Sequence, residues 1–251
     1  MTAYLSREPL LFGTAAFHLL LFLLFLCLIP FDSRTILGIS PWIKPAKFAV
    51  SISIYLATLG VLMPLLPTAS AGLELIRWTA CTTMLLEMVI ISVQSARGVA
   101  SHFNIATGLD ATLFYSMGVL IVLNTLAAFG LLILFLTSQA SALPGVLLGI
   151  RIGLALFIAG SLQGFMMVSR MAHTVGASDG GAGLPFLNWS TQAGDLRVTH
   201  FLFLHAIQVL PLAGWLFRSP AVVWVIALAW SIGGAVLLQL ALRGRPLTSG
   251  F

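Results

Sequence analysis

Long runs of apolar residues, separated by short polar segments, fill almost the whole chain. A helix needs about 20 predominantly apolar residues to cross the roughly 30 Å hydrocarbon layer of a bilayer. Seven runs reach that length, and prolines mark several of their ends. The predicted helices cover residues 10–30, 46–66, 73–97, 111–137, 145–169, 197–217 and 221–242. The pattern therefore predicts an all-α fold: a polytopic integral membrane protein whose seven transmembrane helices form a single domain over residues 1–251.

Composition supports a membrane protein and excludes an ordinary soluble domain. The chain is 59% hydrophobic and 8% charged, with a mean hydropathy of +1.07, whereas soluble domains carry about 25% charged residues. The net charge of +5 comes from lysines and arginines that stand singly at the ends of apolar runs. Residues in such places bind lipid headgroups, so the lipid bilayer is a predicted partner and nucleic acid is not. Cys27 and Cys81 both fall inside predicted helices, which argues against a disulfide framework.

The basic residues divide unevenly between the two sides of the predicted membrane. The smaller set comprises Arg7, Arg77, Arg151 and Arg218, and the larger set comprises Arg34, Lys44, Lys47, Arg97, Arg170, Arg197, Arg243 and Arg245. Short loops rich in lysine and arginine stay in the cytoplasm. The distribution therefore predicts an outside N-terminus, a cytoplasmic C-terminus and a multi-pass protein of the bacterial inner-membrane type.

The longest predicted connection, at about residues 171–195, is rich in glycine and serine. A loop of this length is either functional or disordered, and it lies on the predicted cytoplasmic side. His173, within this loop, is expected to be solvated. Asp195 and Asp110 are predicted helix N-caps, because an aspartate side chain accepts hydrogen bonds from the free N–H groups of a first helical turn.

Small residues recur along the fifth predicted helix. Glycines spaced by four residues allow helix backbones to approach closely inside a membrane. The glycines concerned are Gly145, Gly149, Gly153, Gly160 and Gly164. We predict that they pack against another helix of the same bundle rather than form a dimer contact.

Glu87 lies near the centre of the third predicted helix. Burying an ionised carboxylate in hydrocarbon costs at least a few kcal/mol, so such a group is neutral, paired or directed towards a polar cavity. Polar residues on other helices fall at a similar depth of about 10–15 Å from the positive side, at a rise of 1.5 Å per residue. These residues are Tyr55, Gln163 and His205. On the second helix Tyr55 shares a predicted polar stripe with Lys47, Ser51 and Thr58, at helical spacing.

This arrangement predicts a polar intramembrane site that opens to the cytoplasmic side. We expect Glu87 and His205 to act as an acid–base pair and Tyr55 to donate a hydrogen bond beside them. The side chains expected to bind the substrate are Lys47, Gln94, Arg97, Arg197 and Gln208.

The best-supported interpretation is a membrane-embedded enzyme that uses acid–base or metal-assisted chemistry on a lipid-like or anionic amphiphilic substrate. A proton-coupled small-solute transporter, with His18 and Asn124 as the few polar candidates on the outer side, is the first alternative. A seven-helix receptor or sensor without catalysis is the second.

The histidines leave the cofactor open. His200 and His205 are five residues apart and so point about 140° away from each other on a helix, which does not suit one shared metal ion. A divalent metal held by His102 and His200 stays an alternative. Seven helices resemble the rhodopsin plan, but the last helix has no lysine that could bind retinal. Haem is not expected either, because His18 and His205 differ in depth.

Overall fold

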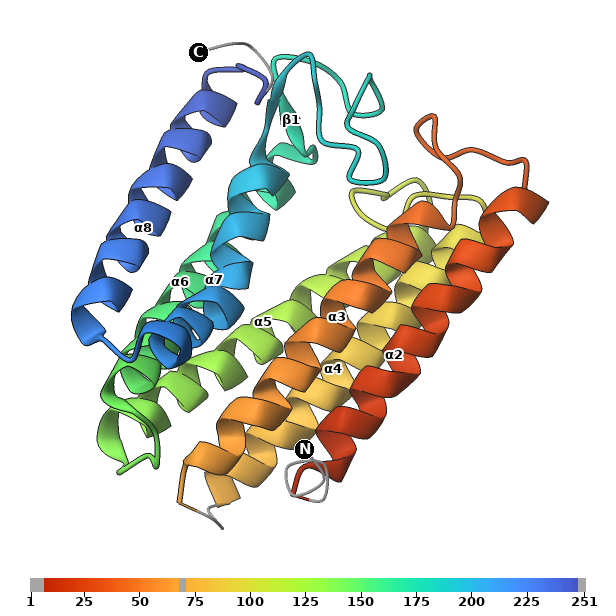
Figure 1. Ribbon diagram of the computed structural model, residues 1–251. Coiled ribbons are helices and arrows are strands. Elements are labelled where there is room, and N and C mark those ends of the chain that lie inside the picture. The colour runs from red at the N-terminus through yellow and green to blue at the C-terminus, as the bar shows by residue number, and fades with distance from the viewer. Residues whose placement is uncertain (1–6, 68–70, 248–251) are drawn as a thin grey trace. The chain divides into compact units, whose positions relative to one another are not determined.

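The computed structural model describes residues 7–67 and 71–247. In that part of the chain, seven helices are long and apolar enough to cross a membrane. They are α2 (Pro9–Leu28), α3 (Ile43–Leu62), α4 (Ala71–Ala96), α5 (Gly108–Thr137), α6 (Pro144–Arg170), α7 (Leu196–Phe217) and α8 (Pro220–Leu242), shown in Figure 1. The short 3-10 helices η1 (Ile29–Phe31) and η2 (Met63–Leu65) extend α2 and α3. The predicted all-α fold, with seven helices long and apolar enough to span a membrane, is confirmed over the described residues.

Capping decides where the helices begin. Asp195 is the N-cap of α7, as predicted, and its carboxylate accepts a hydrogen bond from the backbone N–H of Arg197. Asp110 is not an N-cap, because α5 already begins at Gly108. Thr107 holds that position: its hydroxyl accepts from the Asp110 N–H at 3.1 Å and donates to the Asp110 carboxylate at 2.7 Å. Thr107 is therefore the N-cap and Asp110 the third residue of the helix, so the prediction for Asp110 was wrong by three residues.

The fold consists of two compact units, Met1–Gly130 and Leu131–Phe251, which we call unit 1 and unit 2. Unit 1 holds α2, α3, α4 and most of α5. In this unit α2 packs against α3 and α4. The side chains that α2 buries recur at helical spacing and are Leu11, Thr14, Ala15, His18 and Phe25. A histidine thus stands in the middle of an otherwise largely apolar contact face.

In unit 2, α6 and α7 lie side by side with their backbones in contact (Figure 1). A Cβ atom added to Gly149 would lie 2.4 Å from the carbonyl oxygen of Leu210, and one added to Gly214 would lie 2.3 Å from that of Gly145. Since real Cβ atoms do not come so close, only glycine fits at these positions. The predicted packing of the α6 glycines against another helix of the same chain is confirmed.

The Gly-rich connection between α6 and α7 has its own hydrogen-bonded structure. Strand β1 (Thr174–Val175) pairs antiparallel with β2 (Gly194–Asp195) at its two ends. Between the strands, Gly183 and Ser190 form an isolated β-bridge. The disordered alternative for this loop therefore does not apply, and a functional role for it stays a prediction.

Candidate functional site

Glu87 is a buried carboxylate in the middle of α4. Its side chain is 5% exposed. Most of the other side chains that α4 buries are apolar. In the described part of the chain, no hydrogen bond or ion pair reaches this carboxylate. The Lys44 ammonium, in the first turn of α3, is close enough for its charge to act on it. Glu87 is therefore buried without the donors that normally fix a structural carboxylate.

Other polar residues share the buried face of α4 with Glu87. Arg77, Cys81, Glu87 and Gln94 are spaced by four, six and seven residues, which spreads them over about 140° of the helix surface at 3.6 residues per turn. We call these four residues the polar face of α4. The buried side chains of Met84 and Ile91 fill the turns between them.

Arg77 belongs to an ion-pair cluster at one end of unit 1. Its guanidinium donates two hydrogen bonds, of 2.6 and 2.8 Å, to the buried carboxylate of Glu8. It also pairs with Glu74, which is largely exposed. The cluster joins the start of α2 to the first turns of α4.

The opposite end of α4 is held by a second buried carboxylate, Asp110. The Gln94 side-chain amide donates to Asp110 at 2.9 Å, and the Arg97 guanidinium donates to the same oxygen at 2.6 Å. Arg97 also bonds to the Gln94 side-chain oxygen. These two residues, expected to bind substrate, thus join the end of α4 to the start of α5, and a ligand role for them stays a prediction. The Thr-x-x-Asp spacing before α5 was the available sequence signal for this network.

Asp32 anchors the α2–α3 connection to the same end of α4. Hydrogen bonds from Arg34 hold the pKa of the Asp32 carboxyl well below its usual range, with a further contribution from the Trp42 indole N–H at 2.8 Å. Arg34 in turn donates to the carbonyl oxygen of Ala96 at 2.9 Å. Arg34 and Arg97 therefore both have carboxylate partners at this end of unit 1.

Tyr55 lies in the interior of unit 1 and donates a 3.2 Å hydrogen bond to the side-chain oxygen of Asn124 on α5. Both side chains are buried. The other residues of the predicted α3 stripe behave differently: Ser51 is exposed, and Thr58 donates to its own helix at Ile54. Lys47 is half-buried, one helical turn after Lys44.

His18 is a buried titratable group in unit 1. The sequence predicted it only as a polar residue on the outer side for the transporter alternative. Its imidazole is 0% exposed, and Nδ1 lies 2.8 Å from the carbonyl oxygen of Thr14. Within the described residues Nε2 is buried without a hydrogen bond, although the Met84 carbonyl of α4 faces the ring. One turn away, the Cys81 thiol lies beside the Thr14 hydroxyl.

The remaining predicted site residues are divided between the units. His205 and Gln208 interact on α7 in unit 2, where the His205 ring also contacts Phe201 at a centroid distance of 4.2 Å. The predicted pairing of Glu87 with His205 thus joins residues of different units, and it stays a prediction.

The proposed metal ligands are divided in the same way. His102, in unit 1, has its Nδ1 3.1 Å from the Ser101 hydroxyl. His200, in unit 2, has its Nδ1 2.8 Å from the Gly160 carbonyl oxygen. Over residues 7–67 and 71–247, no group of three or more His, Cys, Asp or Glu side chains is arranged to hold a metal ion.

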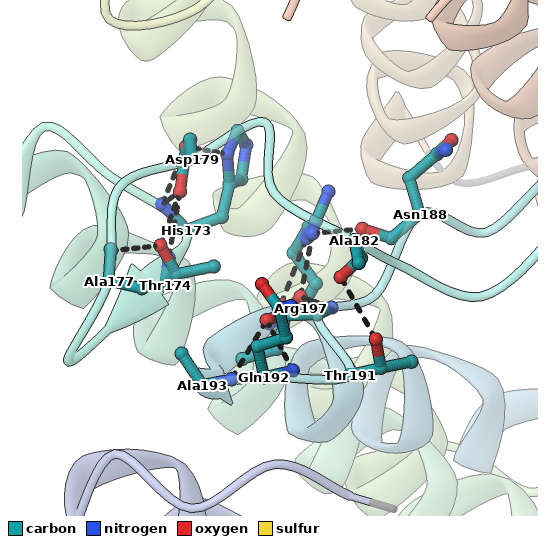
Figure 2. Close-up of polar contacts among 12 residues, drawn as sticks. His173, Thr174, Ala177, Asp179, Ala182, Asn188, Thr191, Gln192, Ala193 and Arg197 are labelled. Carbon is teal, nitrogen blue, oxygen red and sulfur yellow. Dashed lines mark hydrogen bonds and ion pairs between the residues drawn. The ribbon is translucent and has the colours of Figure 1, made fainter. Parts of the chain in front are cut away.

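Two carboxylates organise the loop before α7 (Figure 2). Arg197, expected to bind an anion, donates from Nε and Nη2 to the buried Asp195 at 2.9 and 2.6 Å, and also to the Asn188 carbonyl oxygen. Asp179 accepts from His173, with Nδ1 at 2.5 Å, and from the Thr174 N–H and hydroxyl. The expectation that His173 is simply solvated was wrong, because its ring is mostly buried against Asp179.

The fold and these contacts define an α-helical protein with seven helices long and apolar enough to span a membrane among the described residues, and with polar residues along α4 in unit 1. Comparisons with models of known protein families, with curated proteins and with solved structures find no match.

Proposed function

We propose that this protein is a membrane-embedded acid–base enzyme of the bacterial inner membrane, with its N-terminus outside and its C-terminus in the cytoplasm. Its substrate would be a lipid-like or anionic amphiphile, and Glu87 would exchange the proton. The observation that carries the proposal is the Glu87 carboxylate, 5% exposed in the middle of a candidate span and without a hydrogen-bond donor among the described residues.

Comparison with the other buried carboxylates of unit 1 supports this role. Glu8 and Asp110 each accept hydrogen bonds from an arginine, which keeps a carboxylate ionised. Glu87 has no such donor, so neither of its protonation states is fixed by a direct contact. A group of this kind can take up and release a proton during a reaction, which is what a general acid or base must do.

Lys44 and Lys47 supply the positive charge expected for an anionic substrate. They lie in the first two turns of α3, and the charge of Lys44 acts on Glu87. An anionic headgroup placed beside these ammonium groups would bring its neighbouring atoms towards the carboxyl group. The lipid-like part of the molecule would remain in the hydrocarbon layer, which is the favourable place for it.

Proton-coupled transport is the second candidate, and a specific observation favours it. The polar face of α4 continues past Glu87 to Cys81 and Arg77, at the end of unit 1 opposite Lys44. A transporter needs polar groups on both sides of its central carboxyl group, whereas an enzyme that opens to one side does not.

Infrared difference spectroscopy of the purified protein between acidic and alkaline pH tests the role of Glu87. We expect a protonated-carboxyl signal that Glu87→Gln removes and that Glu74→Gln, on the exposed start of the same helix, leaves in place. Addition of dodecyl phosphate should change this signal in the wild type, and Lys44→Ala should weaken that response. If the spectra of wild type and Glu87→Gln coincide, Glu87 does not exchange a proton and the proposal fails. Chemical turnover of the amphiphile would favour the enzyme, whereas its transport into vesicles in unmodified form would favour the transporter.

A further inference from the structure

The carbonyl contacts of His18 favour a second proton on its ring, whereas its complete burial opposes the charge. A carbonyl oxygen only accepts hydrogen bonds, so the 2.8 Å contact with Thr14 places a proton on Nδ1. In the neutral imidazole, Nε2 then carries a lone pair. That nitrogen is fully buried and has no donor among the described residues, and the ring is faced by a second carbonyl, that of Met84. A proton on Nε2 would replace the repulsion between this lone pair and the carbonyl oxygen with an attraction.

Contacts between α2 and α4 fix the level of His18 along the membrane normal. Glu8 meets Arg77, Thr14 meets Cys81, and His18 meets Met84, so the two helices run parallel. Met84 precedes Glu87 by three residues, or about 4.5 Å along the helix axis. His18 and Glu87 therefore occupy neighbouring levels of unit 1, with Cys81 and Thr14 one turn further from Lys44.

We propose that His18 and Glu87 are consecutive proton-binding groups of a relay that runs through unit 1 along the polar face of α4. Nε2 of His18 binds a proton, and the N–H bond then breaks as an O–H bond forms on the Glu87 carboxylate, directly or across one water molecule. The proton leaves Glu87 towards the end of the unit that carries Lys44. The titratable groups of the helices packed against α2 are Lys44, Lys47 and Tyr55 on α3, and Glu74, Arg77, Cys81 and Glu87 on α4. This inference rests on the proton exchange proposed for Glu87 and adds proton transfer as an activity.

Proton flux into sealed vesicles tests the relay. The full-length protein is reconstituted with an entrapped pH-sensitive dye, valinomycin and potassium, and an acid pulse is applied outside with and without dodecyl phosphate. We expect the wild type to admit protons and His18→Phe, which keeps the site filled, to reduce the rate by about 100-fold, the typical contribution of a positioned proton-transfer group. Thr83→Val is the matched control, because the buried Thr83 hydroxyl bonds only to its own helix, at Thr79 and Ala80.

The outcomes separate this inference from the proposed function. If Glu87→Gln stops the flux and His18→Phe does not, the relay is wrong and the role of Glu87 stands. If the wild type admits no protons under either condition, the relay is also overturned, whatever the infrared spectra show for Glu87. If both variants stop the flux while Thr83→Val does not, the relay is supported.

A second measurement does not depend on a substrate or on flux. In protein with 15N-labelled histidine, the His18 resonances are assigned as those that His18→Phe removes. We expect the remaining spectrum to be unchanged in that variant and the wild-type ring to gain its second proton between about pH 8 and pH 5, the range in which histidine changes charge. A His18 ring that stays neutral over this range would overturn the relay.

Discussion

Carboxylates in this protein differ in how their charge is compensated. Asp32, Asp110 and Asp195 each pair with a nearby arginine, and Asp179 pairs with His173. Glu87, by contrast, meets no donor in the described part of the chain. The paired residues stabilise connections and helix ends, so their protonation should affect local structure, whereas that of Glu87 should affect function.

Acidification should loosen the loop before α7. Burial opposes ionisation of Asp179, but the hydrogen bonds and charge of His173, with the Thr174 hydrogen bonds, outweigh it and hold the pKa of this carboxyl below its usual value. Because the folded pKa is lowered, the stabilisation is complete above the unfolded pKa of about 4 and is lost as the pH falls below it. Hydrogen exchange, corrected for its intrinsic pH dependence, should show the His173 and Thr174 amides losing protection progressively as the pH falls below about 4.

The control for this measurement is Asp179→Asn. It should lower the protection of the same amides already at neutral pH and flatten the pH response, while peptides from the centre of α6 remain protected. Equal protection of the loop at both ends of the pH range would contradict the stabilising role of the Asp179 carboxylate.

At the scale of elements, the backbones of α6 and α7 are in contact, because glycines remove the side chains between them. Helices in a membrane gain little from the hydrophobic effect on association and depend on such close contact. An added methyl group at this interface must therefore separate two backbones.

Gly149→Ala should destabilise the protein by about 1–3 kcal/mol, the typical cost of overpacking, because the new Cβ would meet the Leu210 carbonyl. Gly233→Ala on α8 is the matched control, since a Cβ there has no neighbour within 4 Å. Thermal unfolding in detergent, followed by circular dichroism, should show a lower Tm for Gly149→Ala alone. Equal Tm values for the two variants would show that the α6–α7 contact does not determine stability.

Length and hydropathy were sufficient to predict the seven helices, because both are set by the thickness of the bilayer. The start of α5 was missed because Thr107 and Asp110 are both favourable N-cap residues, and the N-cap rule was applied to Asp110 instead of Thr107. Depth along the membrane could be estimated from the helical rise, but the direction of each side chain could not. Ser51 therefore lies exposed on the predicted stripe, and His18 was not among the predicted site residues although it lies one turn of α4 from Glu87.

At the scale of the whole molecule, orientation determines which end of the polar face of α4 meets the cytoplasm. Arg34 and Arg97 lie in the connections that follow α2 and α4, and further basic residues lie in the helix turns beside these connections and that after α6. This excess favours the cytoplasm for that side. With this orientation Lys44 lies on the cytoplasmic side, and the Arg77 cluster lies on the outer side.

Cysteine labelling of intact cells tests this orientation. In a chain with Cys27 and Cys81 replaced by alanine, a membrane-impermeant maleimide should label Gln139→Cys in intact cells, because the α5–α6 connection is expected outside. Ala106→Cys, in the α4–α5 connection, should react only after the membrane is permeabilised. Both positions are exposed. The reverse pattern would invert the topology and exchange the two ends of the proposed relay.

The glycines of α6 that pack against α7 form a groove along the helix surface, and this groove also has a consequence for biosynthesis. When α6 enters the bilayer, its bare peptide groups at Gly145, Gly149 and Gly153 face acyl chains, which fill such a groove poorly. The matching surface of α7 arrives only after the ribosome has translated residues 171–195. During this interval the glycine surface of α6 is not covered by α7, and other newly synthesised helices can bind to it. Chains that terminate within this loop should therefore be substrates for membrane quality-control proteases, whereas chains that extend past Phe217 can close the groove themselves.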